Sequence, residues 1–355
     1  MTTIAFPIPS IEIVQERVAA AVRAGLMRQR KRLPAWLFYD EAGSRLFDEI
    51  TERPEYYLTR TERAILTRYA DSMVTCAADD QTTNFVPAQL DSFDLEGIGQ
   101  QLSGDARLRI AELGAGSADK TRLLLKAAVA RQGTVIYEPV DVSMTALEAA
   151  KERIESEIPG VIVMPRVEDY TQGFELNPAL PGERRLVLYI GSSIGNFEPW
   201  EAERVLTLVR AGLNPGDAIL LGVDLKKDVA TLLAAYDDAA GVTADFNLNM
   251  LARLNRELGA EFQLDAFEHR AVWNARKSRM EMHLESRVAH RVRVGELDLE
   301  VEFEEGERIH TENSYKYLPG QAEALLASSG FYPVESWTDD LGLFRVCLGR
   351  VKGCF

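Results

Sequence analysis

Between residues 107 and 223, short apolar segments alternate with helical ones, and this rhythm constrains the fold more than any other feature. Leu186–Ile190 is a continuous apolar run bounded by glycine, which is typical of a strand covered on both faces. Repeated strand–helix units predict a doubly wound α/β domain around a parallel sheet. The expected strands are 108–113, 134–137, 161–164, 186–190 and 218–223, and the expected helices are 120–130, 145–157 and 201–213.

The first hundred residues have a different pattern. Apolar residues at helical spacing predict a helix over Ile13–Leu26. Thr59, with Glu62 three residues later, has the pattern of a capping box that opens a helix through Leu66. Residues 77–105 have few periodic apolar positions and many polar residues, so we interpret them as a loop-rich insertion with no assigned role.

After residue 228, two helical stretches over 229–240 and 244–258 precede segments that alternate with period two. Residues 279–286 and 297–303 each place apolar side chains on one face and polar ones on the other, which predicts half-buried antiparallel strands. The tail from Gln321 returns to a helix and then a strand that can rejoin the first sheet. The sequence therefore predicts a second, α+β domain.

Charge and composition exclude several classes of partner. The formal net charge is −15, with acidic residues spread along the chain, which argues against binding to nucleic acid or to anionic membranes. No apolar run reaches a membrane-spanning length and no signal peptide is evident, so we expect a cytoplasmic protein, and a monomer, with a small-molecule substrate. We expect no metal site, because no helical pair of histidines and no CxxC is present among His269, His283, His290, His310, Cys76, Cys347 and Cys354.

A glycine-containing turn, Ala111 to Ser117, follows the first predicted strand and precedes a helix. Gly114 and Gly116 allow a sharp turn and a close approach of the backbone to a ligand. A dinucleotide fingerprint would have a third glycine at 119, where Asp119 stands, so an NAD-dependent oxidoreductase is disfavoured. The turn alone is also compatible with a purely structural role.

Two further elements point to a nucleoside cofactor. Asp141 follows the second predicted strand, the position at which a carboxylate meets ribose hydroxyls in nucleotide-binding folds; a helix-capping Asp is the alternative. Asp169 and Tyr170 follow the third strand and offer an acceptor for an adenine amino group and a ring to pack on adenine. Three such elements at strand ends predict binding of a nucleoside cofactor. The missing third glycine disfavours a pyrophosphate, a group that S-adenosylmethionine lacks.

The whole chain resembles the L-histidine Nα-methyltransferases of ergothioneine biosynthesis. The similarity rests on motifs spread over nearly the full length: Leu37-Phe38-Tyr39-Asp40, Pro54-Glu55-Tyr56-Tyr57 to Glu62, Glu112 to Thr121, Gly191 to Asn196, Ala235 to Thr243, and Thr311-Glu312 with Ser314. It implies a Rossmann-like class I methyltransferase sheet over 61–226 plus 318–355, and a substrate-binding domain over 1–60 plus 227–317. The implied reaction is trimethylation of the α-amino group of L-histidine with S-adenosyl-L-methionine.

The resemblance also assigns residues to roles. The implied cofactor set is Gly114, Lys120, Asp141, Asp169 and Tyr170. The implied substrate set is Tyr56, Asn196, Tyr236, Met282, Glu312 and Ser314, with Tyr39 lining the site. Within these sets Asn196 and Tyr39 lie near the amine, with Tyr39 as a tentative catalytic residue, Tyr236 near the carboxylate, and Glu312 and Ser314 near the imidazole.

Elementary chemistry agrees with the imidazole assignment. Glu312 and Ser314 are two residues apart in an extended segment, so their side chains share one face. A carboxylate and a hydroxyl in such a pair would reject an apolar ring, because their polar groups would be left unpaired. The alternative is that Glu312 and Ser314 are exposed residues on a strand edge with no role in binding. Two rival functions stay open from the sequence: methylation of another aromatic amino acid, such as a tryptophan derivative, and a non-catalytic protein on the same fold.

Overall fold

The computed structural model describes residues 11–79, 106–116, 118–173, 176 and 182–352. Contacts divide the chain into two compact units. Unit 1 consists of Met1–Arg60, Gly195–Glu198 and Asp224–Tyr317, and unit 2 consists of Thr61–Ile194, Pro199–Val223 and Leu318–Phe355. Both units are therefore built from segments that are distant in sequence.

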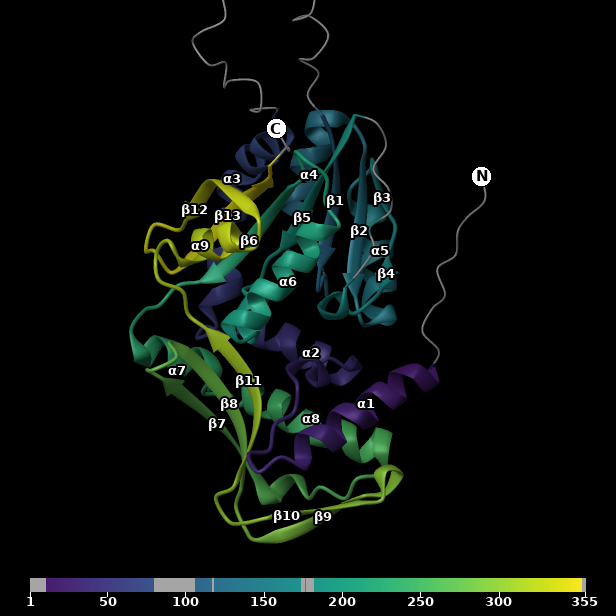
Figure 1. Ribbon diagram of the computed structural model, residues 1–355, viewed down its shortest axis with the longest axis vertical. Coiled ribbons are helices and arrows are strands. Elements are labelled where there is room, and N and C mark those ends of the chain that lie inside the picture. Colours follow the sequence, from purple (N-terminus) through teal and green to yellow (C-terminus); the bar gives the residue numbers. More distant parts are fainter. Residues whose placement is uncertain (1–10, 80–105, 117, 174–175, 177–181, 353–355) are drawn as a thin grey trace, which may run out of the picture. The chain divides into compact units, whose positions relative to one another are not determined.

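Unit 2 contains a doubly wound sheet whose strands follow the order β12-β13-β6-β5-β1-β2-β3, with β4 paired to β2 (Figure 1). Strands β1, β2, β3, β5 and β6 pair in parallel, and β12 and β13 pair antiparallel. Their bounds are β1 Arg107–Leu113, β2 Val135–Asp141, β3 Val161–Val163, β4 Arg166–Val167, β5 Glu183–Tyr189, β6 Ala218–Asp224, β12 Phe331–Thr338 and β13 Phe344–Val351.

The chain leaves β1 toward β2 and β3 and then crosses back to β5 on the other side of β1. This reversal places a topological switch point between β1 and β5, where open α/β sheets bind ligands. The connecting helices are α3 Tyr57–Ala78, α4 Thr121–Gln132, α5 Met144–Glu157, α6 Pro199–Ala211 and α9 Gln321–Ser328. The predicted doubly wound α/β sheet is confirmed, and the tail rejoins it as two strands.

Unit 1 combines helices with an antiparallel sheet of order β11-β8-β7 and a ribbon of β10 and β9 (Figure 1). The strands are β7 Phe267–Asn274, β8 Arg279–Ser286, β9 His290–Val294, β10 Leu299–Phe303 and β11 Arg308–Tyr315. The helices are α1 Ile11–Leu26, η1 Ala35–Phe38, α2 Glu41–Thr51, α7 Val229–Tyr236 and α8 Val242–Leu258. The 3-10 turns of unit 1 are η5 Leu264–Ala266 and η6 Gly295–Leu297; η3 Tyr170–Gln172 belongs to unit 2, and η4 Ser193–Asn196 contains residues of both units.

The alternation predicted for β8 is confirmed by burial. Met280, Met282 and Leu284 are all at most 2% exposed. Glu281 lies on the other face of the strand, where it binds Arg279. One face of β8 therefore belongs to the core of unit 1, and the other carries charged groups.

Several expected boundaries are wrong. Thr59 does not cap a helix, because α3 starts two residues earlier and continues to Ala78; the Glu62 carboxylate is used in tertiary contacts instead. The helix expected over 229–240 ends at Tyr236, because the Asp238 carboxylate caps the next helix by accepting the Val242 and Thr243 N–H groups.

The strand expected over 297–303 begins at Leu299, because the preceding residues form a 3-10 turn that ends at Asp298 in the left-handed region, with φ of 44°. Residues 77 and 78 of the expected insertion belong to α3, and 80–105 lie outside the described residues.

Candidate functional site

The glycine turn of unit 2 connects β1 to α4 at the carboxyl end of the sheet. Gly114 and Gly116 adopt positive φ of 67° and 50°, a region that disfavours residues with a Cβ atom. The Gly114 N–H donates to the Val140 carbonyl at 2.8 Å, which fastens the turn to the end of β2. The turn thus presents its backbone at the switch point.

Asp141, the last residue of β2, holds the same turn. Its Oδ2 accepts the Gly116 N–H and its Oδ1 accepts the Ser143 N–H, both at 3.0 Å. Burial raises the pKa of this carboxyl above its ordinary value, although the backbone hydrogen bonds oppose the shift. A carboxylate oxygen has two lone pairs, so each oxygen retains an acceptor site for a ligand.

Asp169 and Tyr170 lie where β4 has ended. Asp169 caps a short 3-10 turn by accepting the Thr171 N–H at 3.0 Å. The Tyr170 ring lies beside Gly114, since a Cβ built on that glycine would be 3.7 Å from the ring. Burial raises the pKa of Tyr170 to about 12, and its hydroxyl accepts a 3.4 Å hydrogen bond from Tyr189. The two predicted elements are therefore brought next to the glycine turn.

Lys120 forms an ion pair with Glu62, which the sequence analysis did not assign to the site. The Glu62 side chain is fully buried, and its two oxygens accept the Gly191 N–H at 2.8 and 3.0 Å. A Cβ added at Gly191 would lie 3.3 Å from the Lys120 ammonium nitrogen. Helix α3, the start of α4 and the loop after β5 are thereby joined through one carboxylate.

Glu112, in the middle of the glycine motif, serves this unit as a buried support. It accepts hydrogen bonds from Thr121, at 2.6 Å, and from Tyr137. Burial raises its pKa to about 7, and the two hydrogen bonds oppose that shift. The side chain joins β1, β2 and α4 below the turn.

Unit 1 contains a buried polar network around Lys316. Its ammonium group pairs with Asp224 and donates to Tyr236 and Ser314, each at 2.8 Å. Tyr236 donates to Ser314 at 2.6 Å. Tyr57 donates to the same Asp224 oxygen, Oδ2, at 2.6 Å, and Lys227 pairs with Oδ1. Two residues of the predicted substrate set, Tyr236 and Ser314, thus share one buried ammonium group.

A β-bulge decides which face of β11 the substrate set occupies. The pairing with β8 shifts between His310 and Glu312, and the Thr311 hydroxyl donates to the Met282 carbonyl at 3.0 Å. After the bulge, Glu312 pairs with Met282 and Ser314 with Met280. Paired residues of an antiparallel ladder project to the same side, so Met282, Glu312 and Ser314 share the face of Met280.

Glu312 is the carboxyl of the substrate set, and its environment perturbs its pKa. Burial raises its pKa to about 7, while the charge of Lys316 opposes the increase. The same burial lowers the pKa of Lys316 and, together with Asp224 and Glu312, raises that of Tyr236. Perturbed groups that converge on one face are typical of functional sites.

Three other predicted residues lie elsewhere in unit 1. Tyr39 packs edge-to-face on Phe47 at 5.8 Å between ring centres, and Phe47 packs in turn on Tyr56 at 6.2 Å. Both tyrosines therefore belong to one aromatic cluster. Asn196 ends the 3-10 turn Ser193–Asn196 and is half-buried.

The structure thus groups the predicted residues into two sets. The cofactor set lies in unit 2 around the glycine turn, and the substrate set lies in unit 1. Lys316 and Asp224 were missed by the sequence analysis. The signal for Lys316 was present, since it continues the two-residue spacing of Glu312 and Ser314. Asp224 was missed because Lys316 and Tyr57, which both contact its Oδ2, are distant in sequence, and its nearby partner Lys227 does not point to the site.

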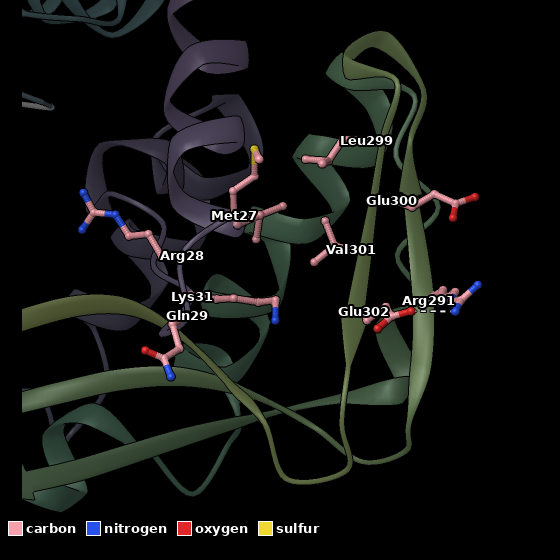
Figure 2. A pocket seen from close by; sticks show the side chains of 10 residues that line it. Met27, Arg28, Gln29, Lys31, Arg291, Leu299, Glu300, Val301 and Glu302 are labelled. Carbon is pink, nitrogen blue, oxygen red and sulfur yellow. Dashed lines mark ion pairs between the residues drawn. The ribbon is translucent and has the colours of Figure 1, made fainter.

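A pocket of about 570 Å³ lies in a different part of unit 1, between the end of α1 and the ribbon of β9 and β10 (Figure 2). Its lining includes Met27, Lys31, Val301 and an ion pair between Arg291 and Glu302. The pocket is lined by no predicted site residue.

A membrane-spanning segment was also sought: within the part of the chain that the structure describes, none of the helices has the length and hydropathy that a membrane span requires.

The strand order, the reversal beside β1 and the two-glycine turn joined to an acidic residue at the end of β2 define a Rossmann-like class I methyltransferase. Residues 18–351 match the model of the family described as histidine-specific, SAM-dependent methyltransferases, so the chain belongs to that family.

Individual relatives agree with this membership. The chain is 42% identical to the histidine N-alpha-methyltransferase of Mycolicibacterium smegmatis, over 94% of each chain. It is 40% identical to that of Mycobacterium tuberculosis, over 92% of each. It is also 29% identical to the ergothioneine biosynthesis protein 1 of Neurospora crassa, over 91% of this chain and 34% of that protein.

Proposed function

We propose that this enzyme transfers three methyl groups in succession from S-adenosyl-L-methionine to the α-amino group of L-histidine, giving N,N,N-trimethylhistidine, the first step of ergothioneine biosynthesis. Family membership supports the reaction class and the cofactor. The observation that carries the substrate is the convergence of Glu312 and Ser314 on one face of β11, with Ser314 held by Tyr236 and Lys316.

In this proposal the Glu312–Ser314 pair recognises a neutral imidazole. Ser314 accepts from both Tyr236 and Lys316, which uses its two lone pairs, so its own proton points to another acceptor. The Glu312 carboxylate is an acceptor when ionised. A neutral imidazole has one N–H donor and one bare nitrogen, and it satisfies both groups at once.

The remaining substrate residues act on the amino-acid end. Tyr236 binds the α-carboxylate: its hydroxyl proton, which is donated to Ser314 in the structure, turns to the carboxylate when the substrate binds, and Lys316 continues to donate to both hydroxyl oxygens. Asn196 and Tyr39 orient the amine, and Tyr39 relays its proton. Tyr56 and Met282 line the site. Packing of both rings on Phe47 supports these roles, because it restricts the side-chain positions of Tyr39 and Tyr56.

The cofactor residues of this proposal are those at the glycine turn. Asp141 accepts the ribose hydroxyls, Asp169 and Tyr170 hold the adenine, Gly114 permits close approach, and Lys120 fixes the loop after β5 through Glu62. Support comes from the position of each at the carboxyl end of the sheet beside the switch point.

The chemistry is an in-line displacement in which the cofactor supplies an electrophilic methyl group on a positively charged sulfur. The amine first loses its ammonium proton; its lone pair then forms the new N–C bond while the electron pair of the C–S bond stays with sulfur, and the third transfer leaves a trimethylammonium group with no N–H. Only the unprotonated amine has a lone pair, so the residues near it must hold it deprotonated and aligned. Positioning of this kind contributes several kcal/mol to a displacement.

Steady-state kinetics with L-histidine, L-phenylalanine and L-tryptophan, with the products identified by mass spectrometry, tests the substrate. Phenylalanine would leave Glu312 and Ser314 unpaired, so we expect its kcat/KM to be about 10⁴-fold below that of histidine. Trimethylhistidine should be the final product. If tryptophan were methylated and histidine were not, the assignment of Glu312 and Ser314 would be wrong. Light scattering would test the accompanying expectation of a monomer.

A further inference from the structure

The face of β8 and β11 opposite to Met282 and Glu312 contains a second group of polar side chains. Glu281 and His283 are two residues apart on β8, and His310 on β11 pairs directly with His283 in the ladder. This arrangement depends on the bulge, because His310 precedes it and Glu312 follows it. The three side chains have no part in the proposed methyl transfer.

Their ligating atoms converge. One nitrogen of each histidine and one carboxylate oxygen of Glu281 all lie within 4.8 Å of one another. Glu281 Oε2 is 3.2 Å from His283 Nε2, and the two imidazole rings lie 5.0 Å apart. Asn313 lies beside them, with its Oδ1 2.9 Å from His310 Nε2.

Part of this polar surface lacks protein partners. Within the described ranges, the buried Nδ1 atoms of His283 and His310 and the buried Nδ2 of Asn313 have no hydrogen-bond partner. Buried polar atoms are normally satisfied, and a bound ion is one of the usual reasons for an exception. The His283 and Glu281 side chains retain 12% and 13% exposure, so an ion can reach them from solvent.

The arginines next to the cluster pair with other carboxylate oxygens and leave Glu281 Oε2 to the histidines. Arg279 binds Glu281 through Oε1 and also pairs with Glu198, and Asn274 donates to the same Oε1 at 2.9 Å. Arg308 pairs with Glu285. These contacts fix the carboxylate in the manner of outer-shell partners of metal ligands and leave Oε2 directed toward the histidines.

We propose that Glu281, His283 and His310 form a binding site for a divalent transition-metal ion, with Zn²⁺ as the representative. Two imidazole nitrogens and one carboxylate oxygen suit zinc, cobalt or nickel, and they are a poor set for calcium or magnesium, which prefer oxygen ligands. Ligand distances of about 2.0–2.2 Å require only small side-chain movements from the observed cluster. The ion would join β8 to β11.

The test uses the full-length protein, freed of any affinity tag and of metal by dialysis against a chelator. Zn²⁺ is titrated by calorimetry, and Co²⁺ is titrated by visible absorption, which reports coordination by imidazole and carboxylate. We expect one strong site, and we expect His283→Gln and His310→Gln each to weaken Zn²⁺ binding by at least about tenfold. Zn²⁺ should also raise the melting temperature of the wild type and not of these variants.

His290→Gln is the matched control, because His290 lies on β9 outside the cluster and bonds to Ser286. It should bind Zn²⁺ like the wild type. If either cluster variant fails to fold by circular dichroism, Glu281→Gln, which keeps the shape of the side chain, replaces it with the same expected loss. Equal Zn²⁺ affinity in wild type and cluster variants, or no strong site in the wild type, would overturn the proposal.

Discussion

Replacing Glu312 by glutamine should stabilise the protein and impair it as an enzyme at the same time. Burial raises the pKa of Glu312 to about 7 from an ordinary value of 4.5. Unfolding returns the carboxyl to the ordinary value. Above pH 7 the side chain is ionised in both states, and the folded state must hold a poorly solvated charge. Between about pH 4.5 and pH 7 this penalty develops, and below that range it is absent.

The size of the penalty follows from the shift. Each pKa unit corresponds to about 1.4 kcal/mol, so the shift implies roughly 3 kcal/mol at high pH. Glu312 is only half-buried and Lys316 is nearby, so we expect about 1–3 kcal/mol after solvent screening. Glutamine removes the charge and keeps the shape. Glu312→Gln should therefore raise the melting temperature by a few degrees at about pH 8.5 and by much less at about pH 5.5.

The same substitution should weaken substrate binding although it stabilises the fold. A hydrogen bond to a charged group contributes about 1.5–3 kcal/mol, so loss of the carboxylate should raise the KM for histidine by about 10- to 100-fold at about pH 8.5. Glu300→Gln, an equal change of charge at an exposed position of β10, is the control and should alter neither quantity. A Glu312→Gln variant that melts no higher than the wild type at high pH and keeps its KM would refute both the burial argument and the assignment to the imidazole.

Three further substitutions test other contacts. Asp141→Asn should weaken binding of S-adenosylhomocysteine about tenfold or more by calorimetry, since a charged acceptor is lost at the glycine turn. Lys316→Met should lower the free energy of unfolding in urea by about 1–3 kcal/mol, because Asp224 loses one buried charged partner and keeps Lys227; an unchanged value would mean that the Lys316 pair is not formed. Gly191→Ala should cost roughly 1–2 kcal/mol, because φ is 80° and the new methyl group crowds Lys120; unchanged stability and cofactor affinity would contradict this geometry.

Much of the fold could be predicted because its signals are local. Residues 186–189 of the expected strand form the end of β5, since an apolar run without alternation requires cover on both faces, and Ile190 lies just beyond it. The helix expected over 145–157 is α5, and Ser143 just before it caps it by accepting the Ala146 N–H. The expected helix boundaries were wrong where a side chain makes contacts with residues that are distant in sequence. Glu62 had the correct spacing for a capping box, but its carboxylate binds Gly191 and Lys120.

The site was less accessible from sequence for the same reason. The glycine turn and Asp141 could be identified because each lies at the end of a predicted strand. The network of Asp224, Lys316 and Tyr236 could not, since it joins three segments through side-chain contacts. No pattern of single residues predicts the bulge at Thr311 either, because a bulge is a property of two strands paired together.

That bulge separates two chemistries on a single pair of strands. Strict alternation would put His310, Glu312 and Ser314 on one face, since they are two residues apart. The extra residue, Thr311, shifts the phase, so His310 projects with His283 while Glu312 and Ser314 project with Met282 and Met280. The Thr311 hydroxyl, fully inside the protein, satisfies the Met282 carbonyl that the shift disturbs. A one-residue change of register reverses every side chain beyond it. Because Thr311 is the extra residue of the bulge, the Glu312 carboxylate and the Ser314 hydroxyl face the Tyr236 network. The same extra residue places His310 and His283 on the opposite face of the two strands.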